Sequence, residues 1–344
     1  MFAINSKNFL AHSAFSLRLS TINLFNFIEP PGAFYEFSNI YSKKQWHQKC
    51  IWLNQYIENY QPDIIAFQEV FSVSALKRLL ELLGYRFFSV VDEPKPITRD
   101  VYNSPVVSLA SRYPILRALP LRAYPELSIQ LGMTKDFEYS RLPLFATLEL
   151  PYIGQTDMYV VHLKSKRPTI YDTIYEKNKL LYNSIFSKMS GSWASSIQRG
   201  SEAYHLMTYI FTRRFHTNNP VIMMGDFNDD INSHVLSAFH MSSLHLITED
   251  IPLSHYSMHD SWDLYVKNTE ETGLKRPDTY YAHAQGSVLD YILLSNEFDG
   301  SDPASIADVG DFHCENKHLI KSKFTKDIYS SDHAIISVTI SLRQ

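Results

Sequence analysis

Short apolar runs, separated by helical stretches, make up most of this chain, and many of the runs end in a polar side chain. Residues 15–23 largely alternate apolar and polar positions and include the β-branched Thr21 and Ile22, which predicts a strand that ends at Asn23. Further apolar runs predict strands within residues 63–70, 85–91, 106–110, 144–150, 158–163, 221–224, 288–294 and 334–340. The chain is therefore rich in strands from end to end.

Two stretches carry apolar residues at the spacing of an α-helix. In residues 43–60 the apolar positions recur every three or four residues, at Trp46, Cys50, Leu53, Ile57 and Tyr60. Pro62 ends this helix, because proline lacks the amide proton that another turn requires. Residues 73–83 predict a second helix, and Gly84 stops it.

The segment 172–216 differs in character from the rest of the chain. It predicts two helical stretches broken around Gly191 and Gly200, and it is longer than a simple crossover between strands requires. No linker composition flanks it, so we interpret it as a helical insertion within a single domain that spans residues 1–344. Because strands outnumber the helices that fall between them, the pattern predicts an α/β or α+β domain with two packed sheets flanked by helices.

Composition narrows the functional class only a little. The 344 residues are 45% hydrophobic and carry a formal net charge of -4, so the chain can bury a large core and is not a polycation. Two cysteines, Cys50 and Cys314, are too few for a disulfide framework and fit a reducing compartment. Neither a signal peptide nor an apolar run of about 18 residues is evident. We therefore expect a monomeric cytoplasmic protein without stable membrane association, with non-classical export left open.

The segment 221–230, VIMMGDFNDD, is the strongest candidate for a functional site. Asp226 and Asn228 follow an apolar strand, where such groups are costly unless a metal ion, a phosphate or a hydrogen-bond network satisfies them. Taken alone, the segment also fits a turn whose polar side chains cap the next helix. The same arrangement recurs at other strand ends, at Asn23, Glu69, Arg141, His162, Asp290, Asp332 and His333. That recurrence favours a site over a series of turns.

Together these side chains have the chemistry of a hard-cation site with a proton-transfer pair beside it. Glu69, Asp226 and Asp332 supply oxygen ligands of the kind that Mg²⁺ or Mn²⁺ prefers. The set contains no thiolate, which argues against structural zinc. Clustered carboxylates repel one another in a partly desolvated cleft, and one or two divalent cations would balance their charge.

The same residues lie in motifs that resemble those of the endonuclease/exonuclease/phosphatase superfamily, in that superfamily's order. The motifs are STINLFN with Asn23, IIAFQEV with Glu69, VVHLKSK with His162, MMGDFND with Asp226 and Asn228, VLDYILLS with Asp290, and SSDHA with Asp332 and His333. SRLPLFATLEL, with Arg141, resembles the arginine-containing strand, and HLKSKRP with RGSEA is most similar to the bacterial extracellular-nuclease-like branch. The resemblance implies the DNase I-like fold, a four-layer α/β/β/α sandwich of two packed mixed sheets flanked by helices.

The resemblance also implies a role for each residue. Asn23 and Glu69 would bind the principal Mg²⁺ or Mn²⁺, with Asp332 at or near the ion. The metal would polarise a phosphoryl oxygen. Asp226 would orient or deprotonate the attacking water, and Asn228 would hydrogen-bond the phosphate.

Four further residues complete the implied catalytic set. Asp290 would accept a hydrogen bond from one ring nitrogen of His333, leaving the other nitrogen to face the phosphate. His162 and Arg141 would donate to the non-bridging oxygens. The implied activity is a metal-dependent phosphoesterase that uses direct attack by an activated water, without a covalent intermediate.

Basic residues around the predicted His162 strand point to a class of substrate. They form a cationic rim on an otherwise acidic chain, at Lys164, Lys166, Arg167 and Arg199. Such a rim favours a nucleic-acid partner held through its backbone phosphates without base readout, so we expect a sequence-nonspecific endonuclease. The insertion at 172–216 would form a helical wall of the substrate groove, with Arg199 facing inward.

Two other functions stay open on the sequence. A phosphatase or a sphingomyelinase-type phosphodiesterase, acting on inositol phosphates or lipid headgroups, would share every catalytic residue with a nuclease and differ only in its loops. A catalytically inactive binding module would use the fold as a scaffold. The intact set of ligands and the histidine pair argue against this last alternative.

Overall fold

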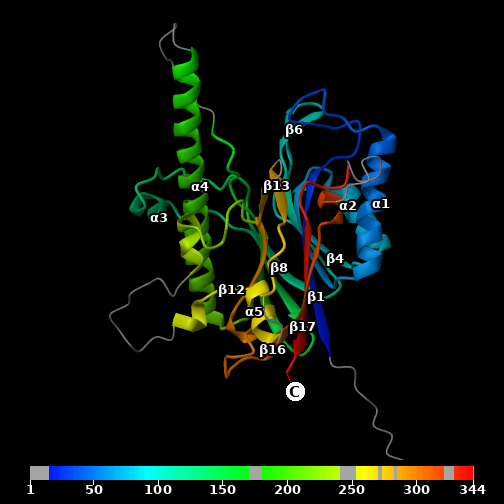
Figure 1. The fold of residues 1–344 in the computed structure, drawn as a ribbon, viewed down its shortest axis with the longest axis vertical. Helices are drawn as coiled ribbons and strands as arrows, with labels where there is room; N and C mark the ends of the chain where they lie inside the picture. The colour runs from blue at the N-terminus through cyan, green and yellow to red at the C-terminus, as the bar shows by residue number, and fades with distance from the viewer. Residues whose placement is uncertain are drawn as a thin grey trace, which may run out of the picture.

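Two six-stranded sheets form the body of the chain (Figure 1). The computed structural model describes residues 15–169, 180–240, 253–269, 273–282, 285–320 and 329–343. In the first sheet the strand order is β16 (Ala307–Glu315), β17 (Ile335–Leu342), β1 (Ser16–Phe27), β3 (Ile64–Val70), β7 (Val106–Ser111) and β4 (Phe87–Val90). In the second it is β12 (His259–Asp260), β15 (Asp290–Leu294), β11 (Val221–Asp226), β10 (Gly154–His162), β9 (Leu144–Leu150) and β8 (Ile115–Pro120).

Smaller elements surround these sheets. Two short sheets contain β2 (Ala33–Phe34), β6 (Val101–Ser104) and β5 (Lys95–Thr98), and β13 (Tyr280–Ala282) with β14 (Gln285–Ser287). The α-helices are α1 (Lys43–Tyr60), α2 (Val73–Leu82), α3 (Pro125–Gln130), α4 (Leu180–Thr217), α5 (Ser261–Asn268) and α6 (Lys317–Ile320). Three 3-10 helices are described at His234–Phe239, Leu253–Tyr256 and Asn296–Phe298. Within these described parts, no helix is long and apolar enough to cross a membrane.

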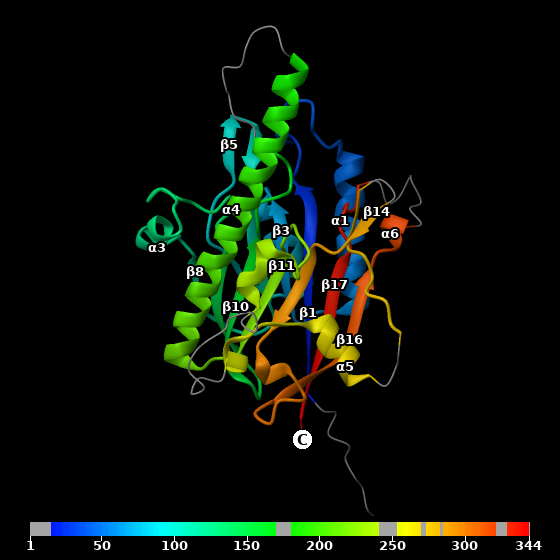
Figure 2. The same cartoon turned by 60° about the vertical axis from the view of Figure 1, so that its left-hand side comes forward.

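Three apolar clusters hold the layers together and confirm the four-layer α/β/β/α sandwich. The central cluster lies between the sheets and joins side chains such as Leu19 of β1 to Val160 of β10 and Ile222 of β11. A second cluster packs α1 and α2 against the outer face of the first sheet. The third packs α4 against the outer face of the second sheet (Figure 2). Each sheet is therefore covered on both faces, which explains why its central strands are continuous apolar runs.

Helix α1 begins and ends where its sequence predicts. Ser42 caps the first turn by accepting a hydrogen bond from the backbone of Gln45, whose side chain in turn accepts one from the backbone of Ser42. At the other end Gln61 adopts the left-handed conformation and precedes Pro62, which cannot continue a helix. The face between these ends buries Leu53 and Ile57 against the first sheet.

The prediction of two helical stretches broken at glycines is wrong. One helix, α4, runs through both Gly191 and Gly200 without interruption, and the start of the predicted insertion lies outside the described residues. A Cβ at Gly191 would come within 2.3 Å of the carbonyl oxygen of Thr169, and the amide of Thr169 donates to the carbonyl of Gly191. This glycine therefore permits close approach of another chain segment and does not end the helix.

Strand register brings the polar strand ends together. Parallel pairing of β1 with β3 sets Asn23 beside Gln68, the residue before Glu69. Parallel pairing of β10 with β11 sets His162 beside Asp226, and antiparallel pairing of β11 with β15 sets Asp226 opposite Asp290. Carboxyl ends of neighbouring parallel strands meet at one edge of a sheet, so these side chains converge on one end of the sandwich.

Strand β1 does not stop at Asn23, as its alternation predicts. It continues to Phe27 through an irregularity at which Phe25 and Asn26 take φ values of 46° and 58°. Asparagine tolerates this left-handed region better than most residues. The irregularity turns the Phe25–Asn26 peptide out of the strand ladder and toward the end of β3.

Candidate active site

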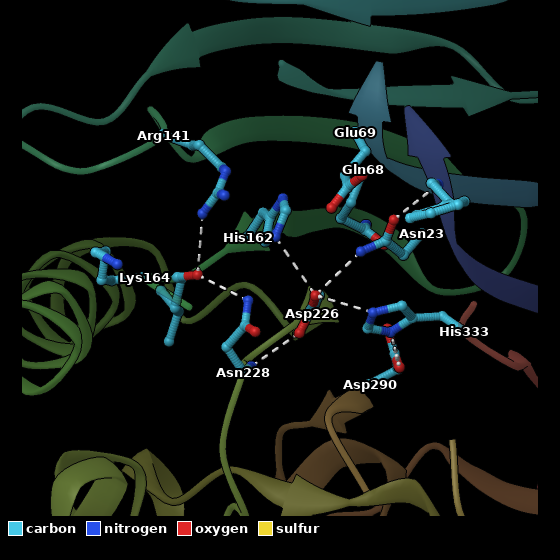
Figure 3. Close-up of polar contacts among 12 residues, drawn as sticks. Asn23, Gln68, Glu69, Arg141, His162, Lys164, Asp226, Asn228, Asp290 and His333 are labelled. Carbon is cyan, nitrogen blue, oxygen red and sulfur yellow. Dashed lines mark hydrogen bonds and ion pairs between the residues drawn. The ribbon is translucent and has the colours of Figure 1, made fainter. Parts of the chain in front are cut away.

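A cleft of about 450 Å³ opens at the end of the sandwich where these strands converge. Most of the polar residues predicted from strand ends line it, namely Glu69, Arg141, His162, Asp226, Asn228, Asp332 and His333. Asn23 and Asp290 lie directly behind this lining and are almost fully buried. The structure thus brings together residues that are up to about 300 positions apart in the chain (Figure 3).

Asp226 occupies the centre of the cluster and is 1% exposed. One carboxylate oxygen accepts a hydrogen bond from the backbone amide of Asn228 at 2.8 Å. The other accepts one from the side-chain amide of Asn23 at 3.1 Å and lies 3.4 Å from Nε2 of His162 and 3.9 Å from Nε2 of His333. Burial raises the pKa of Asp226 to about 7, against the opposing effect of His333. A carboxyl group with this pKa can take up and release a proton near neutral pH.

His333 is held by a carboxylate on one ring nitrogen. Its Nδ1 donates to Asp290 at 2.9 Å, which leaves Nε2 directed at Asp226 and the cleft (Figure 3). Burial disfavours the charged imidazole, but the carboxylates of Asp290 and Asp226 outweigh burial and raise the pKa of His333 well above its usual value. This shift favours the imidazolium form, in which Nε2 presents a proton toward the cleft.

His162 has the opposite protonation preference. Burial, together with the positive charges of Arg141 and His333, lowers its pKa well below the ordinary histidine value. Nε2 of His162 lies 3.4 Å from the Asp226 carboxylate, and in the described part of the chain its buried Nδ1 has no hydrogen-bond partner. Arg141 lines the same wall and donates to the carbonyl of Leu163 at 3.3 Å.

Asn23 and Asn228 both orient their neighbours. Asn23 uses its oxygen to accept from the backbone amide of Phe25 and its amide to donate to Asp226. The role of Asn23 as a metal ligand stays a prediction: its oxygen accepts one hydrogen bond, and the residue lies behind the cleft lining. Asn228 donates to the carbonyl of Leu163 at 3.0 Å and keeps its side-chain oxygen at the cleft wall.

A divalent cation fits the edge of the cleft lined by Glu69, Asp332 and Asn26. One oxygen of Glu69 accepts from the backbone amide of Asn26 at 3.0 Å. Burial raises the pKa of Asp332, and the negative charge of Glu69 adds to this effect while His333 opposes it. Among the described residues nothing donates to the buried Oδ1 of Asn26. Two carboxylates and an unpartnered amide oxygen are the ligand chemistry of Mg²⁺ or Mn²⁺.

A second group of potential ligand atoms lies deeper, at Asp226, Asp290 and His333. Their ligand atoms fall within 4.8 Å of one another. However, the shortest contact in the group is the hydrogen bond between His333 and Asp290, and Asp226 accepts two further hydrogen bonds. Hydrogen bonds engage most of these atoms, but among the described residues Oδ1 of Asp290 has no hydrogen-bond partner. The cation position at Glu69 and Asp332 stays a prediction.

Two of the four basic residues predicted to bind substrate line the cleft, and the other two, Lys164 and Arg199, do not. Lys166 and Arg167 line the cleft, and Lys166 also pairs with Asp229 at 2.8 Å while its side chain stays 59% exposed. Lys164 does not line the cleft, because its ammonium bonds back to the carbonyls of Ser165 and Arg167.

Arg199 was predicted to bind substrate, but it does not line the cleft. It faces inward as expected, but it is 2% exposed and donates to Asp229 through two nitrogens and to the carbonyl of Lys164. It supports the 164–167 loop through the carbonyl of Lys164 and is not among the residues that line the cleft. The negative charge of Asp229 is therefore neutralised by Arg199 and Lys166.

Sequence reasoning missed several residues of the site. Asn26 lies three positions after Asn23 in the same motif, and only the backbone irregularity in β1 reveals that it reaches Glu69. The aromatic residues Phe25, Tyr35 and Tyr280 also line the cleft, and the ring of Tyr280 lies 5.0 Å from that of His333. No local pattern separates these aromatic residues from the many that fill the core.

Comparison with protein families decides the classification. The model of the Endonuclease/Exonuclease/phosphatase family matches residues 52–333, which is most of the chain and contains the Glu69, Asp226 and His333 segments. The chain belongs to the endonuclease/exonuclease/phosphatase family. Comparison with curated proteins finds no significant match.

Solved structures of this family share the fold across almost the whole chain. The human Nocturnin catalytic domain with bound sulfate is 18% identical, with 95% of each chain covered and a TM-score of 0.57. ANGEL2, described as a 2′,3′-cyclic phosphatase, is 14% identical, with 95% of each chain covered and a TM-score of 0.56. A family protein from Bacteroides thetaiotaomicron is 16% identical, with 95% of each chain covered and a TM-score of 0.51.

These likenesses show the DNase I-like fold. The family match supports a phosphoesterase. The likenesses span relatives with different substrates, so they do not separate a nuclease from a phosphatase. The similarity to the bacterial extracellular-nuclease-like branch stays a prediction.

Proposed function

We propose that this protein is a divalent-metal-dependent phosphodiester hydrolase that cleaves nucleic acid without sequence preference. The observation that carries the proposal is geometric: Nε2 of His333 lies 3.9 Å from the buried carboxylate of Asp226 in the cleft, and Asp290 holds the other ring nitrogen at 2.9 Å. An acceptor and a donor of protons thus lie side by side at the floor of one cleft. General acid–base catalysis of water attack requires this arrangement.

Each residue then has a defined task. Asp226 accepts a proton from the attacking water, while its hydrogen bonds from Asn23 and Asn228 hold the carboxylate in place. His333, fixed by Asp290, presents its Nε2 proton to a phosphoryl oxygen.

The walls of the cleft bind the charge that develops on the phosphate. Arg141 supplies a permanent positive charge at the lining. The lowered pKa of His162 favours a neutral ring, and this ring lines the cleft where it would donate to a phosphoryl oxygen.

The cation expected at Glu69, Asp332 and Asn26 would polarise a phosphoryl oxygen and stabilise developing negative charge. Glu69 is positioned for this role by the amide of Asn26. Mg²⁺ and Mn²⁺ both suit an all-oxygen site of this kind.

Nucleic acid is the substrate class that the cleft favours. Lys166 and Arg167 extend the positive lining beyond Arg141, which suits a chain of phosphates better than a single phosphate group. Tyr35 and Tyr280 offer aromatic faces at the same opening, and bases stack on such faces irrespective of sequence.

The test is a panel of substrates with Mg²⁺ and Mn²⁺. It contains plasmid DNA, single-stranded DNA, RNA, an RNA ending in a 2′,3′-cyclic phosphate, sphingomyelin and inositol phosphates. The cyclic phosphate is included because ANGEL2, a protein of similar fold, is a 2′,3′-cyclic phosphatase. We expect cleavage of DNA or RNA at internal positions. Turnover of a lipid or an inositol phosphate with nucleic acids untouched would overturn the substrate assignment and leave the metal-site argument standing.

A further inference from the structure

A fully buried lysine lies behind the metal edge of the cleft, and the mechanism above does not use it. Lys49 is on α1, its side chain is 0% exposed, and it occupies the apolar face of that helix, three residues after Trp46 and four before Leu53. A buried ammonium group is costly unless it is fully hydrogen-bonded, so its contacts must carry considerable weight in this region.

Three backbone carbonyls surround the ammonium group. Nζ of Lys49 donates to Phe25 at 3.0 Å, to Tyr329 at 3.2 Å and to Ser330 at 2.8 Å. These three bonds match the three protons of an ammonium group. The rings of Phe25 and Tyr41 lie beside it, with centroids 5.8 Å and 5.6 Å from Nζ.

The contact with Phe25 reaches Glu69 through a single peptide unit. The Phe25 carbonyl that Lys49 binds belongs to the same planar peptide as the Asn26 amide, and that amide donates to Glu69 at 3.0 Å. In a trans peptide the oxygen and the amide hydrogen point in opposite directions. Holding the oxygen therefore aims the amide hydrogen at the Glu69 carboxylate.

The contacts of Lys49 with Tyr329 and Ser330 hold the segment that carries Asp332, the second predicted metal ligand. Ser330 is two residues before Asp332, and the neighbouring Ser331 hydroxyl donates to the carbonyl of Asn23 at 2.7 Å. Lys49 thus connects the irregular end of β1 to the segment that carries Asp332. These are the two segments that must keep a fixed separation if Glu69 and Asp332 are to share one ion.

Lys49 lies near both carboxylates without being a metal ligand. Burial lowers its pKa to about 7, and the carboxylates of Asp332 and Glu69 act against this shift. None of its three hydrogen bonds goes to a carboxylate, so Glu69 and Asp332 keep their oxygens for an ion.

We propose that Lys49 is a positioning residue for the divalent-cation site, in which its ammonium group ties the Phe25–Asn26 peptide to the Tyr329–Ser330 segment and so sets the distance between Glu69 and Asp332. The inference rests on the proposed metal dependence. It predicts that loss of the ammonium group weakens metal binding more than it weakens catalysis at saturating metal. A residue that served stability alone would lower the melting temperature and leave metal affinity unchanged.

The test measures Mn²⁺ binding directly, by electron paramagnetic resonance of the free ion, in the full-length protein without substrate. Lys49→Met keeps the length of the side chain and removes its charge and donors. We expect the dissociation constant for Mn²⁺ to rise about tenfold or more, the usual effect of removing a group that orients metal ligands. The matched control is Lys44→Met, an exposed position on the same helix, which should bind Mn²⁺ as the wild type does.

Steady-state kinetics add a second readout. The Mg²⁺ concentration needed for half-maximal activity should rise by the same factor in Lys49→Met, whereas kcat at saturating Mg²⁺ should stay within about threefold of the wild-type value, because the catalytic groups remain in place. If Lys49→Met does not fold, Lys49→Gln replaces it, with the same expected loss of affinity because a neutral amide cannot supply three donors.

The possible outcomes are distinct. Wild-type Mn²⁺ affinity in a folded Lys49→Met or Lys49→Gln variant overturns the role of Lys49 and leaves the proposed function intact. Failure of the wild-type protein itself to bind Mn²⁺ overturns both proposals. Loss of affinity in the Lys49 variants together with normal affinity in Lys44→Met supports the inference.

Discussion

His333 and Asp290 form a buried pair in which Nδ1 of the imidazole donates to the carboxylate at 2.9 Å. Asp290 is the first residue of β15 in the second sheet, and His333 lies just before β17 in the first sheet. The bond therefore crosses from one sheet of the sandwich to the other. The two residues are 43 positions apart in the sequence and meet only in the folded chain. Proton transfer through this pair therefore requires correct packing of the two sheets.

Because each member of this pair needs the other, we expect their mutations to be strongly non-additive. His333→Ala should reduce kcat roughly 10³-fold, within the range for loss of an acid–base group. His333→Ala combined with Asp290→Ala should cost little more than His333→Ala alone. A double-mutant cycle on kcat measures this, and combination of His333→Ala with Glu81→Ala on the exposed face of α2 provides an additive control. Additive losses for the buried pair would show that the two residues act separately.

The raised pKa of Asp226 predicts the acidic limb of the pH profile. Burial raises this pKa to about 7, and the group acts as a base only when ionised, so activity should be lost as pH falls through about 7. The raised pKa of His333 keeps its ring protonated, so the alkaline limb should lie well above the usual histidine range. The measurement is kcat/KM against pH at limiting metal, since a bound cation would favour the carboxylate and move the acidic limb lower. A residual activity of Asp226→Asn that retained this limb would assign it to another group.

We expect activity to depend on a divalent cation that Glu69 helps to bind. We expect activity to disappear in EDTA and to return with Mg²⁺ or Mn²⁺, because the Glu69 edge of the cleft holds the oxygen ligands. Glu69→Gln should raise the metal concentration needed for half-maximal activity at least tenfold, by loss of a charged ligand. Glu81→Gln, on the exposed surface of α2, is the control and should behave as wild type. Full activity in EDTA would contradict the proposed function.

Lys166 and Arg167 should bind substrate through charge alone. Replacing both with alanine should raise KM for DNA or RNA equally for all sequences and leave kcat nearly unchanged. The slope of log KM against log salt should fall by about one for each phosphate contact that is lost. Lys188→Ala, at an exposed position of α4, is the matched control for loss of a surface charge. An unchanged salt slope in the double variant would place the nucleic acid elsewhere.

We expect a mutation of Arg199 to lower the stability of the protein and to leave substrate binding unchanged. Its guanidinium pairs with Asp229 in a buried setting, and removal of one partner leaves the other charge uncompensated. We expect Arg199→Ala to lower the free energy of unfolding by about 3 kcal/mol, the lower end of the range for a broken buried pair. Denaturant unfolding measures this change. A folded Arg199→Ala variant of wild-type stability but weakened substrate binding would restore the role that the sequence predicts.

The sequence predicted the helices and the central strands well, because hydrophobic spacing and capping residues determine these elements locally. The stripe of α1, with Ser42 before it and Pro62 after it, is a complete helix signal, and VIMMGD is a strand buried on both faces in any context that covers it. The edge strands β8 and β16 are less buried than the central strands, so their hydrophobic patterns are weaker and the sequence did not reveal them. Gly191 and Gly200 look like breaks in α4 because the close approach of Thr169 to the first and of Val235 to the second is invisible in the sequence.

The sequence by itself determined which polar groups stand at strand ends, since chain order and hydrophobic period place Glu69, Asp226 and His333 beside buried strands. Only the tertiary structure decided which groups reach the cleft. Lys166 and Arg199 are both basic residues near the end of β10, yet one lines the cleft and the other is buried against Asp229. The difference depends on how α4 packs behind the 164–167 loop. A basic side chain that packing buries beside a carboxylate stabilises the fold, whereas one that packing leaves at the cleft can bind substrate.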